Sequence, residues 1–313
     1  MARYVVRRTA QAAVVLLGVS VLVFLLVHLV PGDPIRTAMG PRYDPEVYQR
    51  LSERAGFDQP LPVQYGQWLA GAVTGDLGVS FRTGRPVMGA LLERLPATLT
   101  LAFASVVVAL LIALPLGVLS AVRSGSKLDY AATVFSQVGI SIPDFWMGIL
   151  FILVFAEYLQ ILPASGYASL LDDPVAWLRH LLMPAVTIGV VSGSILTRFV
   201  RSSVLESLGQ DYVRTARAKG LSERVVVTRH VLRNALIPFV TVTGLQLATL
   251  LGGVIIVEFV FAWPGLGLLA LQAVDARDYT VLQGAVLLIA TLFLLINLVV
   301  DLLYAWLDPR IKY

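Results

Sequence analysis

The feature that most constrains this fold is a series of long apolar runs that carry almost no charge. The first run, Thr9 to Val30, has 22 residues and no Asp, Glu, Lys or Arg. A helix of that length spans about 33 Å, which matches the hydrocarbon core of a bilayer. Of the 313 residues, 57% are hydrophobic and only 14% are charged. This composition excludes an ordinary soluble protein and predicts an all-α polytopic membrane protein.

Five further apolar segments bring the prediction to six transmembrane helices. Counted from Thr9 to Val30, the third segment (Ala131 to Leu162) is too long for one straight crossing and contains Ile142-Pro143-Asp144-Phe145, so we expect a break or kink at Pro143. In the fifth segment (Ile237 to Phe261), Gly244, Gly252 and Gly253 would let helices approach closely. The five segments are Leu99 to Val122, Ala131 to Leu162, Leu181 to Val200, Ile237 to Phe261 and Thr280 to Leu307.

A long polar region, residues 31 to 98, separates the first apolar run from the others. The first run leads into Pro31-Gly32-Asp33-Pro34 without a small-residue cleavage site, so we expect it to be retained as a helix. Two short helices are predicted near Pro45 to Ala55 and Val63 to Val73, packed on the membrane helices or on a partner. A disordered linker is the alternative, but the many aromatic residues of the region disfavour it. The predicted organisation is therefore 1–30, an external region 31–98, and a five-helix core 99–313.

Basic residues in short connections predict the orientation of the chain. With a cytoplasmic N-terminus, 15 basic residues lie on the cytoplasmic side, and only Arg179 and Arg277 lie in short external connections. The region 31–98 is not counted, because long segments cross the membrane regardless of charge. Both termini are therefore predicted to be cytoplasmic. The 15 residues are Arg3, Arg7, Arg8, Arg123, Lys127, Arg198, Arg201, Arg214, Arg217, Lys219, Arg224, Arg229, Arg233, Arg310 and Lys312.

The largest cytoplasmic connection, residues 201–236, has its own helical pattern. Tyr212 to Lys219 consists of good helix formers, Gly220 can adopt the left-handed conformation that ends a helix, and Ser222 can cap a second helix. Helices this short are marginal alone, so we expect this connection to be ordered by docking.

Motifs for catalysis or metal binding are missing from the sequence. A P-loop requires Gly directly before Lys, whereas the three lysines follow Ser126, Ala218 and Ile311. There is no cysteine, the three histidines (His28, His180 and His230) are far apart, and no HExxH or GxSxG pattern occurs. We therefore expect neither catalytic nor metal-binding residues in this chain. No nucleic-acid partner is needed to explain the basic residues, since membrane topology accounts for them.

Ionisable residues at membrane depth are candidates for a translocation pathway. Asp144 follows the predicted break, Glu258 closes the fifth span and Asp301 lies in the inner part of the sixth. Asp144 and Glu258 are the candidates we single out. The alternatives are that Asp144 only caps the second half-helix and that Asp301 only pairs with a neighbouring arginine.

The sequence ARAKGLSERVVVTRHVLRNALIP, from Ala216 to Pro238, resembles the conserved cytoplasmic loop of ABC importer permeases, in the form of the dipeptide and oligopeptide (B-type) branch. The general pattern of that loop begins Glu-Ala-Ala and has Gly in its seventh place. Here those places hold Arg214, Thr215, Ala216 and Gly220, a departure that the peptide branch shares. The strings GDLGVSFRTGRPV, SIPDFWMGILFILVFA, EFVFAWPGLG and LDPRIKY carry the resemblance over nearly the whole chain.

This resemblance implies a type I importer in a bacterial inner membrane. Such an importer has two different six-helix permeases, two ATPases that bind ATP and Mg, and an external solute-binding protein. The first helix of the loop would enter a groove on an ATPase, with small Ala216 close to the groove wall and Gly220 supplying the turn. The coupling residues implied are Arg214, Thr215, Ala216, Arg217, Ala218, Lys219 and Gly220.

Three functions follow as hypotheses. The first is a permease subunit that imports short peptides, and the second is import of nickel or another small solute by the same kind of machine. The third, a proton-coupled secondary transporter, predicts inverted repeats and intramembrane proton carriers, and neither is found in the sequence. A membrane enzyme is disfavoured, because the sequence lacks a recognisable set of nucleophile, base or metal-binding residues.

Overall fold

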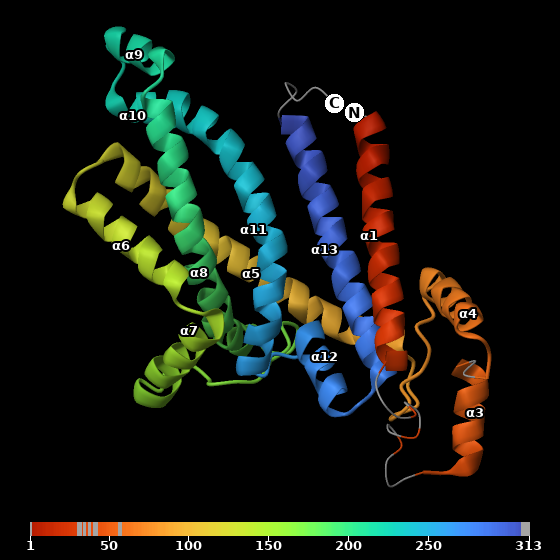
Figure 1. Cartoon of the computed structure of the whole chain (residues 1–313). Helices are drawn as coiled ribbons and strands as arrows, with labels where there is room; N and C mark the ends of the chain where they lie inside the picture. The colour runs from red at the N-terminus through yellow and green to blue at the C-terminus, as the bar shows by residue number, and fades with distance from the viewer. Residues whose placement is uncertain are drawn as a thin grey trace. The chain divides into compact units, whose positions relative to one another are not determined.

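The computed structural model is helical throughout its ordered elements (Figure 1). It describes residues 2–29, 43–55 and 58–307, together with the single residues 33, 36 and 39. At some positions within these ranges, mainly between 236 and 251 and from 303 on, it describes the backbone alone. Arg310, Lys312 and most of the Pro31 to Pro34 segment therefore lie outside the described residues. One isolated antiparallel bridge, between Val79 and Pro86, is the only β-structure among the residues described.

The chain forms two compact units. The first contains residues 100–263 and 299 onward, and the second contains residues 2–99 and 264–298. Helices α5 and α13 contribute to both units. The helices are α1 (Ala2–Leu29), α3 (Pro45–Ala55), α4 (Leu61–Thr74), α5 (Val87–Val122), α6 (Lys127–Ser141), α7 (Asp144–Phe151), α8 (Pro174–Leu208), α9 (Asp211–Ala218), α10 (Glu223–Val225), α11 (Leu232–Val260), α12 (Leu266–Asp275) and α13 (Tyr279–Leu307), with π-helical stretches η2 (Ile152–Tyr158) and η3 (Val226–Val231).

The first unit is built around α8, which packs against α6 and α11. Asp173 caps α8 by accepting hydrogen bonds from the backbone N–H groups of Val175 and Ala176, and Pro174 occupies the first turn, where no donor is lost. α8 is longer at both ends than the predicted span 181–200, because its polar ends continue the helix. The shared core includes Ala109, Ala113, Leu196, Val200, Val204, Val213, Ala216, Val226, Val231 and Phe239.

The predicted break at Pro143 is confirmed. Lys127–Ser141 and Asp144–Tyr158 meet at an angle of 105°. Ile142 has extended backbone angles (φ −92°, ψ 123°), as expected for a residue before proline, and Pro143 has no N–H to continue the helical ladder. The third apolar segment is therefore two helices with a sharp corner.

In the second unit, α4 packs against the last three turns of α1. The Ser20 hydroxyl and the Tyr65 hydroxyl lie 2.9 Å apart, and the rings of Phe24 and Tyr65 meet edge to face at 5.3 Å. Both short helices predicted in the external region are present, as α3 and α4, and α4 does pack on a membrane helix. The core of this unit consists of Leu77, Val87, Leu91, Leu266, Ala273, Val281 and Ala285.

Helix α5 begins twelve residues earlier than the predicted span, because Val87 and Leu91 are fully buried in the core of the second unit. Among the described residues, four helices are long and apolar enough to cross a membrane, or five spans if the bent pair is one span. α11 covers the predicted fifth segment. The count of six spans stays a prediction. The four helices lie at Val5–Leu29, Val87–Val122, Pro174–Leu208 and Tyr279–Leu302.

Candidate functional site

The connection between α8 and α11 folds as a helix, a glycine turn and a second helix, as predicted. α9 ends at Ala218, and Gly220 has φ +77°, the left-handed conformation expected from the sequence. Ser222 precedes α10 with extended backbone, but its side chain makes no capping hydrogen bond. In Figure 1, α9 and α10 lie at the end of α8 and α11 that is opposite to α7.

One face of α9 is docked on the chain's own core. Val213 (0% exposed) and Ala216 (5% exposed) are three residues apart and therefore share a face of the helix. They belong to the same cluster as Val226 and Val231 of η3. This packing explains how an eight-residue helix is ordered without a partner. It also means that the small side chain of Ala216 allows a close approach to the chain's own η3, and does not face outward.

The outer face of α9 is polar and basic. The exposed residues of α9 and of the turn after it are Asp211, Tyr212, Arg214, Thr215, Arg217, Ala218, Lys219 and Gly220. Arg214 is 75% exposed and lies 3.6 Å from Asp211, a contact that stabilises little at such exposure. A protein that contacts this loop from outside therefore meets Arg214, Thr215, Arg217, Ala218 and Lys219.

A second ion pair braces the glycine turn. Arg217 donates from Nε to Glu223 at 3.1 Å, and its Nη2 donates to the other carboxylate oxygen. These hydrogen bonds hold the pKa of the Glu223 carboxyl below its ordinary value. The stabilisation from the Arg217–Glu223 ion pair is therefore complete above the ordinary carboxyl pKa. It is lost as the pH falls through the lowered pKa of Glu223, so the ion pair is intact at neutral pH. Both side chains are about half exposed, so its contribution to stability is small.

A partly buried ion pair, in which the Asp129 side chain is 9% exposed and the Arg201 side chain 32%, fixes the end of α8 that leads into α9. Arg201 donates to the two carboxylate oxygens of Asp129 from Nε (2.7 Å) and Nη2 (3.0 Å). Asp129 also accepts from the Ser120 hydroxyl (2.5 Å) and the Gly125 amide (2.9 Å). The pair joins the end of α5, the start of α6 and α8. Sequence analysis missed it, since Arg201 counted there only as a topology charge.

The two candidate pathway acids both lie at the end of α11 that contacts α7. Asp144 is the first residue of α7 rather than its N-cap, which is Pro143. A β-carbon at Gly253 would lie 2.8 Å from the Asp144 Oδ2, so the glycine allows this approach of α7 to α11. Glu258 follows five residues later and is fully buried. The sequence also singled out Gly244 and Gly252 of α11. A β-carbon added at Gly244 would lie 2.0 Å from Val300 Cγ1, so this glycine also allows a close contact, whereas a β-carbon added at Gly252 would meet open space.

The sequence matches two family models that together cover nearly all of it. Residues 113–313 match the model described as "Binding-protein-dependent transport system inner membrane component". Residues 1–102 match the model of the N-terminal part of the corresponding membrane component. The chain belongs to this family. It is therefore an ABC importer permease subunit and a multi-pass inner-membrane protein.

Relatives of the permease match over their full length. It is 39% identical to the dipeptide transport system permease protein DppB of Alkalihalophilus pseudofirmus, with 100% of both chains covered. It is 41% identical to the oligopeptide transport system permease protein AppB of Bacillus subtilis, again with 100% of both chains covered. The dipeptide permease protein DppB of Escherichia coli K12 is 39% identical, with 100% of this chain and 99% of the relative covered.

A solved structure confirms the fold class. An inward-facing structure of the MetNI methionine ABC transporter matches with a TM-score of 0.59 and 24% identity, over 71% of this chain and 97% of that chain. At this identity the likeness shows the fold alone, which is that of a type I importer permease. The predicted family and fold class are thus confirmed.

Replacement of Gly220 tests the turn of the permease loop. Gly220→Val places a β-branched residue at φ +77°, which costs about 1–2 kcal/mol of local stability. We expect protease cleavage within 209–222 to become several-fold faster, with unchanged amounts of protein in the membrane. The control is Gly209→Ala, because Gly209 has φ −78° and ordinary space around it. Equal cleavage of the two variants would show that the left-handed turn does not order the loop.

Proposed function

We propose that this permease forms half of a translocation pathway for short peptides, delivered by an external solute-binding protein. The observation that carries the proposal is the match of about 40% identity, over the full chain, to relatives named for dipeptide and oligopeptide transport. A second, homologous permease would form the other half, and two separate ATPases would bind ATP and Mg. The sequence supports separate ATPases, because none of its three lysines follows a glycine.

The proposed coupling element is the connection from Asp211 to Glu223. Its inner face is fixed to the permease by Val213 and Ala216, and its outer face is exposed. An element that is rigid on one side and exposed on the other can transmit a displacement between two bodies. We assign the coupling contacts to the outer residues Arg214, Thr215, Arg217, Ala218 and Lys219, and give Ala216 and Gly220 the role of holding that face in place.

Asp144 and Glu258 are proposed as pathway residues. Both are acids within the apolar segments of a transport protein, and Asp144 lies at a helix break beside α11. Interrupted helices at membrane depth occur where the backbone is buried in protein or lines a cavity.

Uptake measurements distinguish peptides from other solutes. Cells with and without the gene are given labelled dipeptide, labelled oligopeptide and labelled nickel. The proposal predicts that peptide uptake alone depends on the gene. Gene-dependent nickel uptake with unchanged peptide uptake would contradict it and support the second hypothesis from the sequence.

Reporter fusions test the orientation on which this assignment depends. Fusions after Ser124, at Leu221 and at Tyr313 are expected to report the cytoplasmic side, and fusions at Gly56 and Asp172 the external side. The reason is the excess of basic residues in the short connections of one side. A cytoplasmic signal at Gly56 or Asp172 would contradict this topology.

A further inference from the structure

The first unit has an apolar groove of about 730 Å³ where α6, α7 and α8 meet. α7 leaves α6 at an angle of 105°, and this bend gives the groove walls from both helices. Apart from the Tyr130 hydroxyl, the side chains that line it are apolar among the described residues. The lining includes Tyr130, Val134 and Val138 of α6, Met147 and Phe151 of α7, and Val190 of α8.

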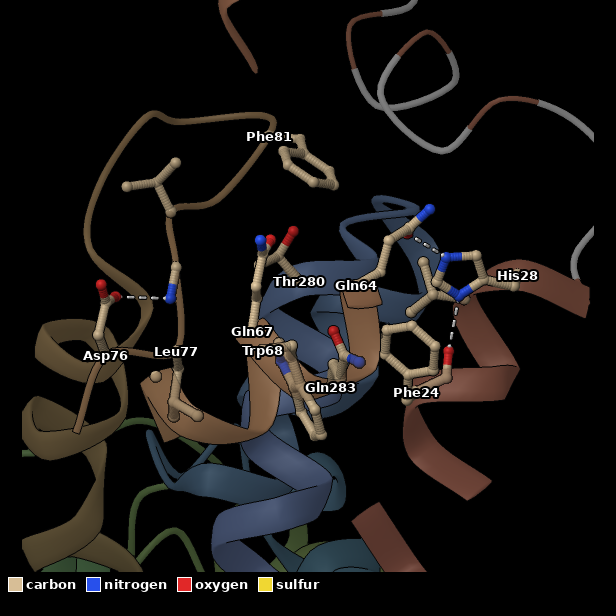
Figure 2. Close-up of a pocket in the computed structure, with 14 residues that line it drawn as sticks. Phe24, His28, Gln64, Gln67, Trp68, Asp76, Leu77, Phe81, Thr280 and Gln283 are labelled. Atoms are coloured by element: carbon tan, nitrogen blue, oxygen red, sulfur yellow. Dashed lines mark hydrogen bonds between the residues drawn. The ribbon is translucent and has the colours of Figure 1, made fainter. Parts of the chain in front are cut away.

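This lining differs from that of a pocket of about 550 Å³ in the second unit (Figure 2). There, Gln64, Gln67 and Gln283 lie among the lining side chains, and their amides can hydrogen-bond water or a polar ligand. The groove of the first unit offers almost no such bonds. A polar occupant would lose its hydrogen bonds to water there without replacement, so the groove selects an apolar one.

The opposite face of α6 is already packed on α8. The Ser136 hydroxyl donates to the Ser194 carbonyl oxygen, and a β-carbon at Gly139 would lie 2.0 Å from the Ser194 Oγ. This close contact fixes the rotation of α6 and leaves its groove face outward, with Tyr130 74% exposed and Val138 51% exposed. An outward apolar face of this kind marks a contact with lipid or with another protein.

Basic residues stand at the start of the groove face. With 3.6 residues per turn, Lys127 lies on the same stripe of α6 as Ala131 and Val134, which line the groove. Lys127 is exposed, and so is Arg123 in the turn before it. This turn directly follows the apolar span of α5, so both cations and the Tyr130 hydroxyl lie at a membrane–water interface.

The carboxylate nearest in sequence belongs to the other face of α6. Asp129 is buried, and its Oδ1 accepts a hydrogen bond from the Arg201 Nε at 2.7 Å. Its charge is therefore balanced by Arg201 of α8 and not by Lys127. The groove stripe thus combines a cationic start at the interface with an apolar continuation toward the bend.

We propose that this groove holds one acyl chain of an anionic phospholipid, such as phosphatidylglycerol, whose phosphate lies beside Lys127 and Arg123. The acyl chain follows the stripe of α6 from Tyr130 toward α7. Basic residues near a membrane surface attract anionic headgroups, whereas a choline headgroup adds a cation that opposes them. An apolar helix of a second permease would fill the groove but would leave Lys127 without a complement on the stripe. The inference depends neither on the orientation of the chain nor on the solute.

The test uses the permease with its partner subunits in phosphatidylcholine nanodiscs. The discs contain a small fraction of a phospholipid with a photoactivatable diazirine in its acyl chain, and its headgroup is either glycerol or choline. After illumination, mass spectrometry of proteolytic fragments measures the label on residues 130–151. We expect the glycerol probe to label this segment at least fivefold more than the choline probe, since one basic residue near the surface contributes about 1 kcal/mol.

One set of variants removes the charge. Lys127→Gln keeps a good helix former and should lower the ratio of glycerol to choline labelling about fivefold. The double variant with Arg123→Gln should lower it further. The control is Arg229→Gln, because Arg229 is an exposed arginine of η3 and not of the groove stripe. It should leave the ratio unchanged.

A second pair of variants fills the groove. Val134→Trp places a large ring in the lining and should lower labelling of residues 130–151 by both probes several-fold. Ile140→Trp is the matched control, because Val134 is 42% exposed and Ile140 is 41% exposed on the same helix. Ile140 follows Val138 by two positions and therefore lies on the other side of α6. Labelling should be unchanged in this control.

Three results would overturn the proposal. The first is equal labelling by the glycerol and choline probes in the original protein. The second is an unchanged ratio when both Arg123 and Lys127 are replaced by glutamine. The third is no labelling of residues 130–151 by either probe, because the groove would then be covered by protein, such as a helix of the second permease.

Discussion

Arg201→Met is expected to destabilise the permease by about 3 kcal/mol and to abolish uptake, although Arg201 lies in no predicted pathway. The substitution leaves the Asp129 carboxylate, whose side chain is 9% exposed, with only the Ser120 hydroxyl and the Gly125 amide. An uncompensated buried charge costs more than the pair itself contributes. Uptake should fail because the pair fixes the end of α8, from which α9 follows after Leu208.

A second substitution identifies the charge as the cause. Asp129→Asn combined with Arg201→Met leaves no buried charge, so the double variant should recover part of the thermal midpoint lost in Arg201→Met. The control is Arg198→Met, since Arg198 is an exposed arginine one turn earlier in α8. Thermal midpoints of the purified complex measure all three. Equal losses for Arg198→Met and Arg201→Met, or no recovery in the double variant, would contradict the account.

Sequence patterns predicted the local features of this fold well. Pro143 broke the third segment because a proline lacks its N–H and restricts the residue before it, and both effects are local. Gly220 ended its helix because a glycine adopts positive φ without steric cost. The family resemblance was confirmed because it rested on the order of residues along nearly the whole chain.

Features that depend on tertiary contacts were not predictable in the same way. Asp129 and Arg201 are 72 residues apart, and Arg201 had an adequate local explanation as a charge near the end of a span. The start of α5 at Val87 depends on the core of the second unit, which no local pattern shows. The direction of Ala216 was also hidden, because a small residue fits an inner contact and an outer groove equally well.

The second large effect is expected at the outer face of α9. Arg214→Glu reverses a charge that is 75% exposed, so the thermal midpoint of the isolated permease should hardly change. If the outer face contacts acidic side chains of an ATPase, however, the same reversal opposes like charges across an interface, which costs several kcal/mol. Uptake should then fall at least tenfold. Ala216→Asp is a poorer test, because Ala216 is buried and the substitution would disrupt the loop itself.

Arg229→Glu supplies the matched control. Arg229 is an exposed arginine of the same connection, but it lies on η3 and not on α9. The two substitutions change the net charge of the loop equally. If the loop is basic only because membrane topology requires it, both variants should behave alike. If α9 is the coupling element, only Arg214→Glu should lose transport.

The most direct test of this coupling role is ATP hydrolysis stimulated by substrate, measured on the purified complex of both permeases and both ATPases. With Arg214→Glu, we predict that stimulation is lost and that less ATPase co-purifies, while the complex carrying Arg229→Glu keeps both. Normal stimulation and normal co-purification in the Arg214→Glu complex would contradict the assignment of α9 as the element that couples this permease to its ATPases.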